Sequence, residues 1–131
     1  MLENSYRLPF TIKDLEYGLK EAVGFLRFDK NHLILELQQQ DAFVGALKSD
    51  VQNLKISFSE IQEIKIDKGM FSTSVIIEGS HMASLSEVPG SKQGNVELKI
   101  DRKNKKEADR VISALNLALS EYRLNQMDED S

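Results

Sequence analysis

The sequence has no cysteine, and this excludes several kinds of chemistry. With none among 131 residues, the chain cannot form disulfide bonds, use a thiolate nucleophile or bind zinc through cysteine. No apolar run approaches the roughly 18 to 20 residues that would cross a bilayer. The first residues also lack the basic start and apolar stretch of a signal peptide. We therefore expect a cytoplasmic protein that is stabilised by side-chain packing alone.

An excess of basic charge is missing as well. The chain has 17 Lys and Arg against 21 Asp and Glu, a formal net charge of -4. General nucleic-acid binding depends on a basic surface, so we do not expect a nucleic-acid partner. Hydrophobic residues at 40% and charged residues at 29% are typical of a globular protein. A length of 131 residues predicts a single domain, residues 1–131.

Motifs for catalysis, metals and cofactors are also lacking. The only two histidines, His32 and His81, have no second metal ligand at a recognisable spacing. Ser80 and Ser84 lie near His81, but no nucleophile elbow surrounds them. The glycine-rich segment 89–94 lacks the Walker spacing. We expect no metal, no cofactor and no enzymatic activity, and keep a small enzyme as a remote alternative.

What the sequence does contain is alternation of apolar and polar residues, which predicts β-strands. Seven strands are expected between residues 23 and 100, at 23–28, 33–37, 54–58, 61–66, 72–78, 82–88 and 96–100. Residues 1–22 are predicted to be an N-terminal extension, because Pro9 restricts the strand-like segment 6–12 to a sheet edge. Residues 38–53 are predicted to be a long connection.

One amphipathic helix is predicted at 104–123, followed by an acidic tail at 124–131. Asn104 is the expected N-cap, and Glu107 would complete a capping box. An apolar stripe on one side of the helix would cover the sheet; it consists of Ala108, Val111, Ile112, Leu115, Leu119 and Tyr122. The predicted fold is therefore mainly β, a seven-stranded curved sheet or barrel capped by a C-terminal helix.

The segment Ile56-Ser57-Phe58-Ser59-Glu60-Ile61-Gln62-Glu63-Ile64 resembles a phrase of GRAM and bacterial pleckstrin-homology-like domains. Phe58, Glu60 and Ile61 occupy its aromatic, acidic and isoleucine positions. The order of seven strands and one terminal helix is also similar to the pleckstrin-homology-like superfold. The resemblance covers about residues 23–122. It implies a non-catalytic module that binds lipid headgroups, peptides or protein surfaces, or that self-associates.

Two apolar pairs are candidate partner-binding residues. Met70 and Phe71 follow a glycine at a predicted hairpin turn, where polar residues are usual. They either contact a partner, a second subunit or a membrane, or fold back over the sheet edge. Leu117 and Leu124 form a second apolar line on the helix. That line is covered by the segment 8–12, by a second subunit, or only by solvent.

A basic run at the start of the helix is the candidate anion-binding site. It contains Arg102, Lys103, Lys105 and Lys106. Lysines in the first turn of a helix oppose the helix dipole, which favours negative charge there, so a bound anion would relieve this repulsion. The alternative is a solvated turn whose charges are screened by salt.

Two functions follow from these candidates. The first is an interaction module that binds a protein partner or self-assembles, through residues such as Met70 and Phe71. The second is a peripheral membrane module. In that case Lys103, Lys105 and Lys106 would meet anionic headgroups.

Overall fold

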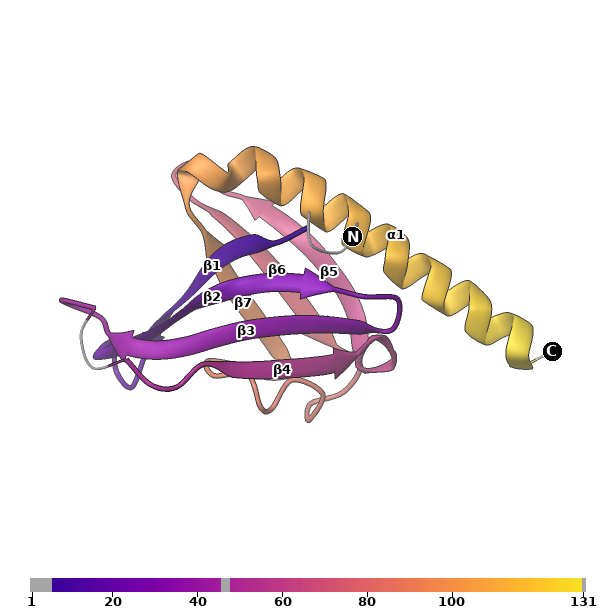
Figure 1. Ribbon diagram of the computed structural model, residues 1–131, viewed down its shortest axis with the longest axis horizontal. Helices are drawn as coiled ribbons and strands as arrows, with labels where there is room; N and C mark the ends of the chain where they lie inside the picture. Colours follow the sequence, from indigo (N-terminus) through magenta and orange to yellow (C-terminus); the bar gives the residue numbers. More distant parts are fainter. Residues whose placement is uncertain (1–5, 46–47, 131) are drawn as a thin grey trace.

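The computed structural model describes residues 6–45 and 48–130, without the side chains of 129 and 130. It contains seven strands and one long helix (Figure 1). The strands are β1 (Leu8–Leu15), β2 (Lys20–Phe28), β3 (His32–Asp41), β4 (Gln52–Ser57), β5 (Ile61–Lys68), β6 (Thr73–Gly79) and β7 (Asn95–Ile100). The helix α1 spans Lys105–Asp130, and short 3₁₀ turns lie at Phe58–Glu60 and Arg102–Asn104.

All seven strands form one antiparallel sheet in the order β4-β3-β2-β1-β7-β6-β5. The mainly-β fold class with a C-terminal helix is therefore confirmed. The sheet is strongly curved (Figure 1), but β4 and β5 remain unpaired edges. It is an open sheet and not a closed barrel.

Six of the seven predicted strands match β2 to β7, but the seventh strand is β1 and not the predicted segment 82–88. The segment 1–22 contributes β1, which lies in the middle of the sheet between β2 and β7. Pro9 is tolerated there because β1 pairs with β7 over a short stretch, at Thr11 and Lys99. The expected strand at 82–88 is a series of turns. Leu85 and Val88 in this segment are buried and fill the open side of the sheet. The expected long connection, 38–53, is shorter, because β3 runs on to Asp41 and β4 begins at Gln52.

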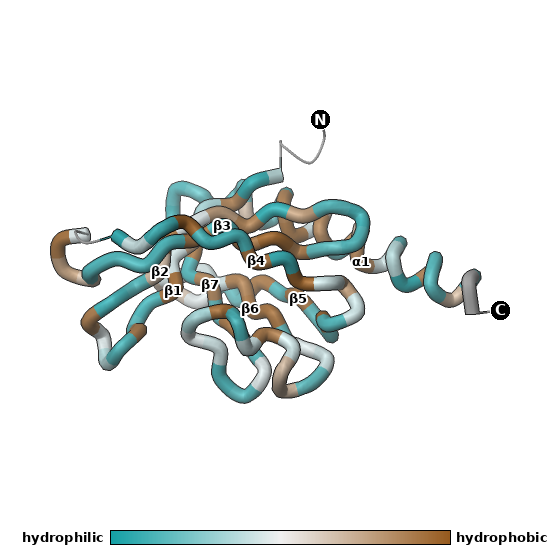
Figure 2. Tube along the Cα trace, turned by 60° about the horizontal axis from the view of Figure 1, so that its bottom comes forward, coloured by the Kyte–Doolittle hydropathy of each residue, from teal (hydrophilic) through white to brown (hydrophobic). Residues whose placement is uncertain are grey.

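The hydrophobic core lies between the concave face of the sheet and α1. Figure 2 shows hydrophobic and hydrophilic positions alternating along the strands, as expected for a sheet with one covered face. The predicted stripe on the helix is confirmed, because Val111, Leu115 and Leu119 are buried in the core cluster. Tyr122 packs edge-on against Phe58, with the ring centroids 5.7 Å apart.

The start and the end of the helix differ from the prediction. Asp101 caps the 3₁₀ turn that leads into α1, and its carboxylate accepts a hydrogen bond from the Lys103 amide. Asn104 therefore lies inside this turn, and Asp101 takes the N-cap position that was predicted for Asn104. The Glu107 carboxylate accepts from Arg110 instead, and this bond holds the pKa of Glu107 below its usual value. The predicted acidic tail continues the helix to Asp130; residue 131 lies outside the described part.

The β2–β3 hairpin follows the prediction, with Asp29 ordering its turn. The carboxylate accepts hydrogen bonds from the backbone amides of Asn31 and His32, both at 2.8 Å, and lies 3.2 Å from His32 Nδ1. Partial burial acts to raise the pKa of Asp29, but these hydrogen bonds outweigh it and the pKa is lowered. The charged form of Asp29 is therefore favoured by folding.

We expect Asp29→Ala to lower the free energy of unfolding by about 1 kcal/mol at neutral pH, the usual value of such local hydrogen bonds. A carboxylate whose pKa is depressed by folding stabilises above its unfolded pKa, and this contribution disappears as pH falls through the folded value. Urea unfolding of both proteins at several pH values measures the difference. The difference in the free energy of unfolding should stay at about 1 kcal/mol from pH 5 to 7. It should shrink below about pH 4. A difference that grows on acidification would contradict this role of Asp29.

Candidate functional site

The candidate site lies where the β5–β6 turn meets the start of α1. Thr73, the first residue of β6, pairs with Ile100, the last residue of β7. This register places the turn directly beside the chain that enters the helix. An ion pair between Lys68 Nζ and Asp109 Oδ1, 2.9 Å apart, joins β5 to α1. The turn and the helix start are thus held together from two sides.

Met70 and Phe71 form the tip of this turn. The Gly69 amide donates to the Ser72 carbonyl at 2.8 Å, which closes the hairpin and leaves the two residues between them at its tip. Met70 is 88% exposed and Phe71 is 82% exposed. The alternative that Phe71 folds back over the sheet edge is therefore wrong. Two large apolar side chains are presented to solvent by an ordered turn.

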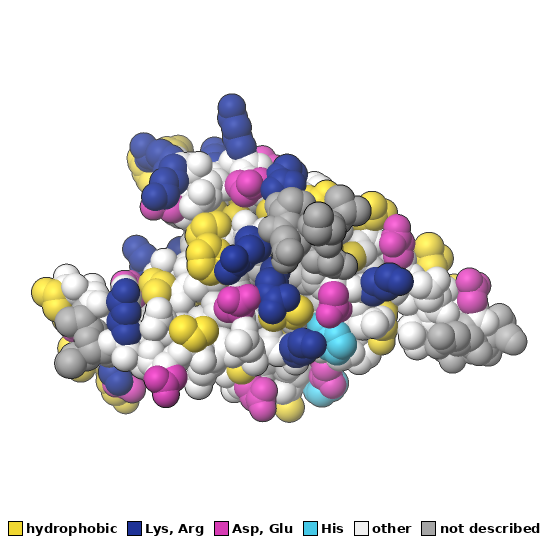
Figure 3. Space-filling model, viewed as in Figure 1, with side chains coloured by type: hydrophobic (Ala, Val, Ile, Leu, Met, Phe, Trp, Pro, Cys, Tyr) yellow, Lys and Arg dark blue, Asp and Glu magenta, His cyan; other side chains and the backbone are white. Residues whose placement is uncertain are grey.

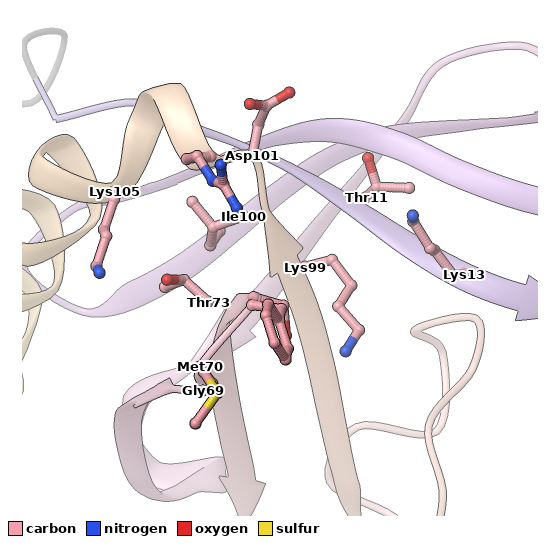
Figure 4. Close-up of a pocket in the computed structure, with 12 residues that line it drawn as sticks. Thr11, Lys13, Gly69, Met70, Thr73, Lys99, Ile100, Asp101 and Lys105 are labelled. Carbon is pink, nitrogen blue, oxygen red and sulfur yellow. The ribbon is translucent and has the colours of Figure 1, made fainter.

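Basic side chains from four elements surround this tip. A pocket of about 250 Å³ is lined by Met70 and Phe71 together with basic residues, which are Lys13 of β1, Lys99 of β7, Arg102 of the 3₁₀ turn and Lys105 of α1. Figure 4 shows Lys105 on one side of the pocket and Lys13 and Lys99 on the other. Figure 3 shows the same combination at the surface, where Lys and Arg side chains adjoin hydrophobic ones near the start of the helix.

The pocket is positively charged although the chain is acidic. Its four basic residues face a single acidic one, Asp101. Lys99 lies 3.3 Å from Glu97. Within the described residues, no carboxylate lies within 4.0 Å of the charged groups of Lys13, Arg102 or Lys105. These three cations are available to an external anion.

Thr73 contributes a polar group to the wall of the pocket. It is only 5% exposed and lines the pocket between Met70 and Lys105 (Figure 4). Its hydroxyl makes no hydrogen bond to any residue in the described part of the chain. The hydroxyl keeps access to the pocket, so Thr73 can donate to a bound anion.

The structure joins two groups of residues that the sequence suggested separately. Met70 and Phe71 lie beside Arg102 and Lys105 in one pocket. Lys103 lies in the neighbouring groove, which is lined by Pro9, Phe25 and Lys99 among others.

One predicted residue lies outside this pocket, and three residues that were not predicted line it. Lys106 is exposed and lines none of the pockets described for residues 6–45 and 48–130. Lys13, Lys99 and Thr73 were missed, because only the pairing of strands distant in sequence brings them here.

Leu117 and Leu124 lie apart from this site. They are 61% and 60% exposed. At a rise of about 1.5 Å per residue, Leu117 lies roughly 18 Å along the helix from Lys105. The suggestion that residues 8–12 cover this line is wrong, because Leu8 and Ile12 are buried in the core. The end of α1 projects beyond the sheet (Figure 1).

A second exposed apolar group lies on the β1–β2 and β3–β4 turns. The Ala42 amide donates to the Leu19 carbonyl at 3.0 Å, so the two turns lie side by side. Their exposed members are Tyr17, Leu19, Phe43 and Val44. Acidic residues flank these positions, namely Asp14, Glu16 and Asp41. Lys20 follows Leu19, but its Nζ lies 3.8 Å from Glu16 Oε1, so its charge is offset, unlike those of Lys13, Arg102 and Lys105.

The other candidates for chemistry give no catalytic arrangement. His81 Nε2 lies 3.2 Å from Glu60 Oε2, and its backbone amide donates to Ser84 Oγ. Within residues 6–45 and 48–130, no group of three or more His, Asp or Glu is placed to hold a metal ion. In the same residues, no helix is both long and apolar enough to span a membrane.

Comparison of the chain with protein-family models, with curated proteins and with solved structures finds no match. The order of seven antiparallel strands and one C-terminal helix is compatible with a pleckstrin-homology-like fold.

Proposed function

We propose that this chain is a non-catalytic, peripheral module that docks reversibly onto anionic phospholipid membranes through the β5–β6 turn. Met70 and Phe71 enter the interface, while the surrounding cations meet the headgroups. The observation that carries the proposal is the shared pocket of two exposed apolar side chains and four basic ones. The tip is surrounded by a basic ring, which consists of Lys13, Lys99, Arg102 and Lys105. A protein surface that combines exposed apolar side chains with surrounding cations binds favourably at the interface of an anionic bilayer.

The expected strength is modest. Burial of a large apolar side chain contributes roughly 1.5 to 3 kcal/mol, and each cation close to an anionic surface contributes about 1 kcal/mol. Two apolar and four basic side chains thus give on the order of 7 to 10 kcal/mol before the entropic cost of attachment. The result is weak, salt-sensitive binding that a second contact would strengthen.

The fold supports the same class of function only by analogy. We assign the chain to the pleckstrin-homology-like superfold, with a GRAM-like phrase at residues 56–64. The resemblance implies a binding module and not an enzyme. The choice of an anionic membrane as the partner rests on the pocket.

Self-association through the tip of the turn is less favoured. In a symmetric dimer centred on Met70 and Phe71, the cations of both copies would approach each other. Like charges in contact oppose association. An anionic surface has the opposite sign and does not meet this repulsion.

Vesicle sedimentation tests the proposal. We expect the chain to sediment with phosphatidylserine-containing vesicles at low salt, to stay in solution with pure phosphatidylcholine, and to be released as salt approaches about 1 M, where the Debye length falls to about 3 Å. Equal binding to both vesicles, or none to either, would contradict it.

A further inference from the structure

The two edge strands of the sheet, β5 and β4, differ in whether other parts of the chain form hydrogen bonds to them. Side chains of α1 donate hydrogen bonds to carbonyls on the outer edge of β5. Asn116 Nδ2 donates to the Ile64 carbonyl at 3.2 Å. Arg123 Nη2 donates to the Ile61 and Gln62 carbonyls at 3.0 and 2.7 Å. The other edge strand, β4, pairs only with β3. Within the described residues, no backbone hydrogen bond is made on its outer side. An unpaired strand edge is a template for another strand.

A groove of about 480 Å³ lies along this free edge. One wall is Leu54–Ser57 of β4, and the other is residues 83–88 of the segment between β6 and β7. No residue of β3 lines the groove, so it lies on the outer side of β4. Figure 1 shows the β6–β7 segment passing beneath β4. Leu85 and Val88 are 1% and 2% exposed and anchor the second wall in the core.

The shape of the groove selects its occupant. The edge of β4 offers backbone donors and acceptors, which only an extended chain can satisfy at the strand spacing of about 4.8 Å. Residues 83–88 stand opposite the edge of β4, where the sheet of a second copy would have to enter, so pairing of β4 with β4 of a second copy is disfavoured. A single extended peptide fits between the walls.

The chemistry at one end of the groove indicates which side chain such a peptide carries. Glu60 Oε2 is inaccessible to solvent and accepts no hydrogen bond from any residue that the structure describes. Its nearest charged neighbour is His81 Nε2, 3.2 Å away, which forms an ion pair only when the imidazole is protonated. Glu87 adds a second carboxylate to the lining, against one lysine, Lys55. A buried acceptor without a donor is unusual, and a lysine or arginine of the peptide would supply that donor.

We propose that the groove binds an extended segment of a partner protein, which adds to β4 as an eighth strand and places a basic side chain at Glu60. An apolar side chain of the peptide packs on the partly exposed Leu54 of β4. This site is separate from the basic pocket and does not depend on membrane binding.

The test uses the full chain and a random dodecapeptide phage library, followed by synthesis of the selected peptides. We expect selected peptides to alternate apolar residues and to contain a lysine or arginine. In hydrogen exchange measured by NMR, a bound peptide should slow exchange of alternate amides of β4 by at least about tenfold, because those amides face solvent in the free chain. Methylation of alternate peptide nitrogens should abolish binding.

Three variants sharpen the result. Ala83→Trp, which fills the groove, should abolish binding, whereas Ser120→Trp, on the exposed side of α1, should not. Glu60→Gln should weaken basic peptides more than variants of the same peptides with norleucine in place of the basic residue. Failure to select any peptide, or binding that leaves the β4 amides unprotected, would overturn the proposal.

Discussion

Gly24→Ala is expected to prevent folding. Gly24 lies within β2, opposite Phe10 on one side and Leu37 on the other. A Cβ atom at this position would lie 1.8 Å from the Glu36 carbonyl oxygen and 2.8 Å from Leu37 Cα. Both atoms belong to the backbone of β3, so no side-chain rotation relieves the clash. The close approach of β2 and β3 therefore requires glycine.

Overpacking of a core usually costs about 1 to 3 kcal/mol, and a backbone overlap of this size exceeds that range. Total stability of a domain is about 5 to 15 kcal/mol, so Gly24→Ala should leave little folded protein. Circular dichroism and thermal unfolding measure the effect. Gly69→Ala is the control, because its nearest contact is 3.2 Å and its φ angle is not positive. A Gly24→Ala protein as stable as Gly69→Ala would contradict this packing of β2.

The second large effect is expected from the double variant Arg102→Gln/Lys105→Gln. Removal of two cations at about 1 kcal/mol each should weaken binding to anionic vesicles roughly thirtyfold, since about 1.4 kcal/mol corresponds to a factor of ten. The loss should be independent of stability. Lys105 opposes the helix dipole at the start of α1, so its neutralisation should leave the melting temperature unchanged or slightly higher.

Lys30→Gln/Lys55→Gln is the matched control for this variant. It removes the same net charge from positions outside the basic pocket, and Lys30 and Lys55 are both exposed. Its vesicle affinity should stay within about threefold of the unmodified chain, because contributions from charges far from the bilayer are screened. Equal losses in the two variants would show that net charge, and not the pocket, drives binding.

Much of the fold could be predicted from local pattern. The stripe of the helix and the β2–β3 turn depend on residues close in sequence, and both are confirmed. The prediction of a strand at 82–88 was wrong, because the spacing of apolar residues in this segment is also typical of a strand. Its backbone instead forms successive turns, with amides of Ser84, Ser86 and Val88 bonded three residues back. Leu85 and Val88 are apolar because they fill the open side of the sheet.

Residues 6–12 were recognised as strand-like, but the interior position of β1 was missed, for a different reason. Pro9 argues against an interior strand in general, and the sequence does not reveal that the pairing of β1 with β7 is short. The capping residue was displaced by three positions, because Asp101 begins a 3₁₀ turn before the α-helix. Local propensity did not distinguish Asp101 from Asn104.

The candidate site was only half visible in the sequence. An apolar pair at a turn and a basic helix start each stand out, so Met70, Phe71, Arg102 and Lys105 were identified. Their proximity depends on the register in which Thr73 faces Ile100, which is a long-range property. Lys13 and Lys99 each lie on an ordinary alternating strand, and nothing local sets them apart.

The most direct test of membrane docking is the fluorescence of Phe71→Trp. The chain has no tryptophan, so the variant carries a single reporter at the tip of the β5–β6 turn. Phe43→Trp is the control, since Phe43 is 76% exposed, close to the 82% of Phe71, but lies on a turn without the basic ring. We predict that phosphatidylserine-containing vesicles shift the emission of Phe71→Trp to the blue and leave that of Phe43→Trp unchanged. An unchanged Phe71→Trp spectrum, or equal shifts in both variants, would contradict docking through this turn.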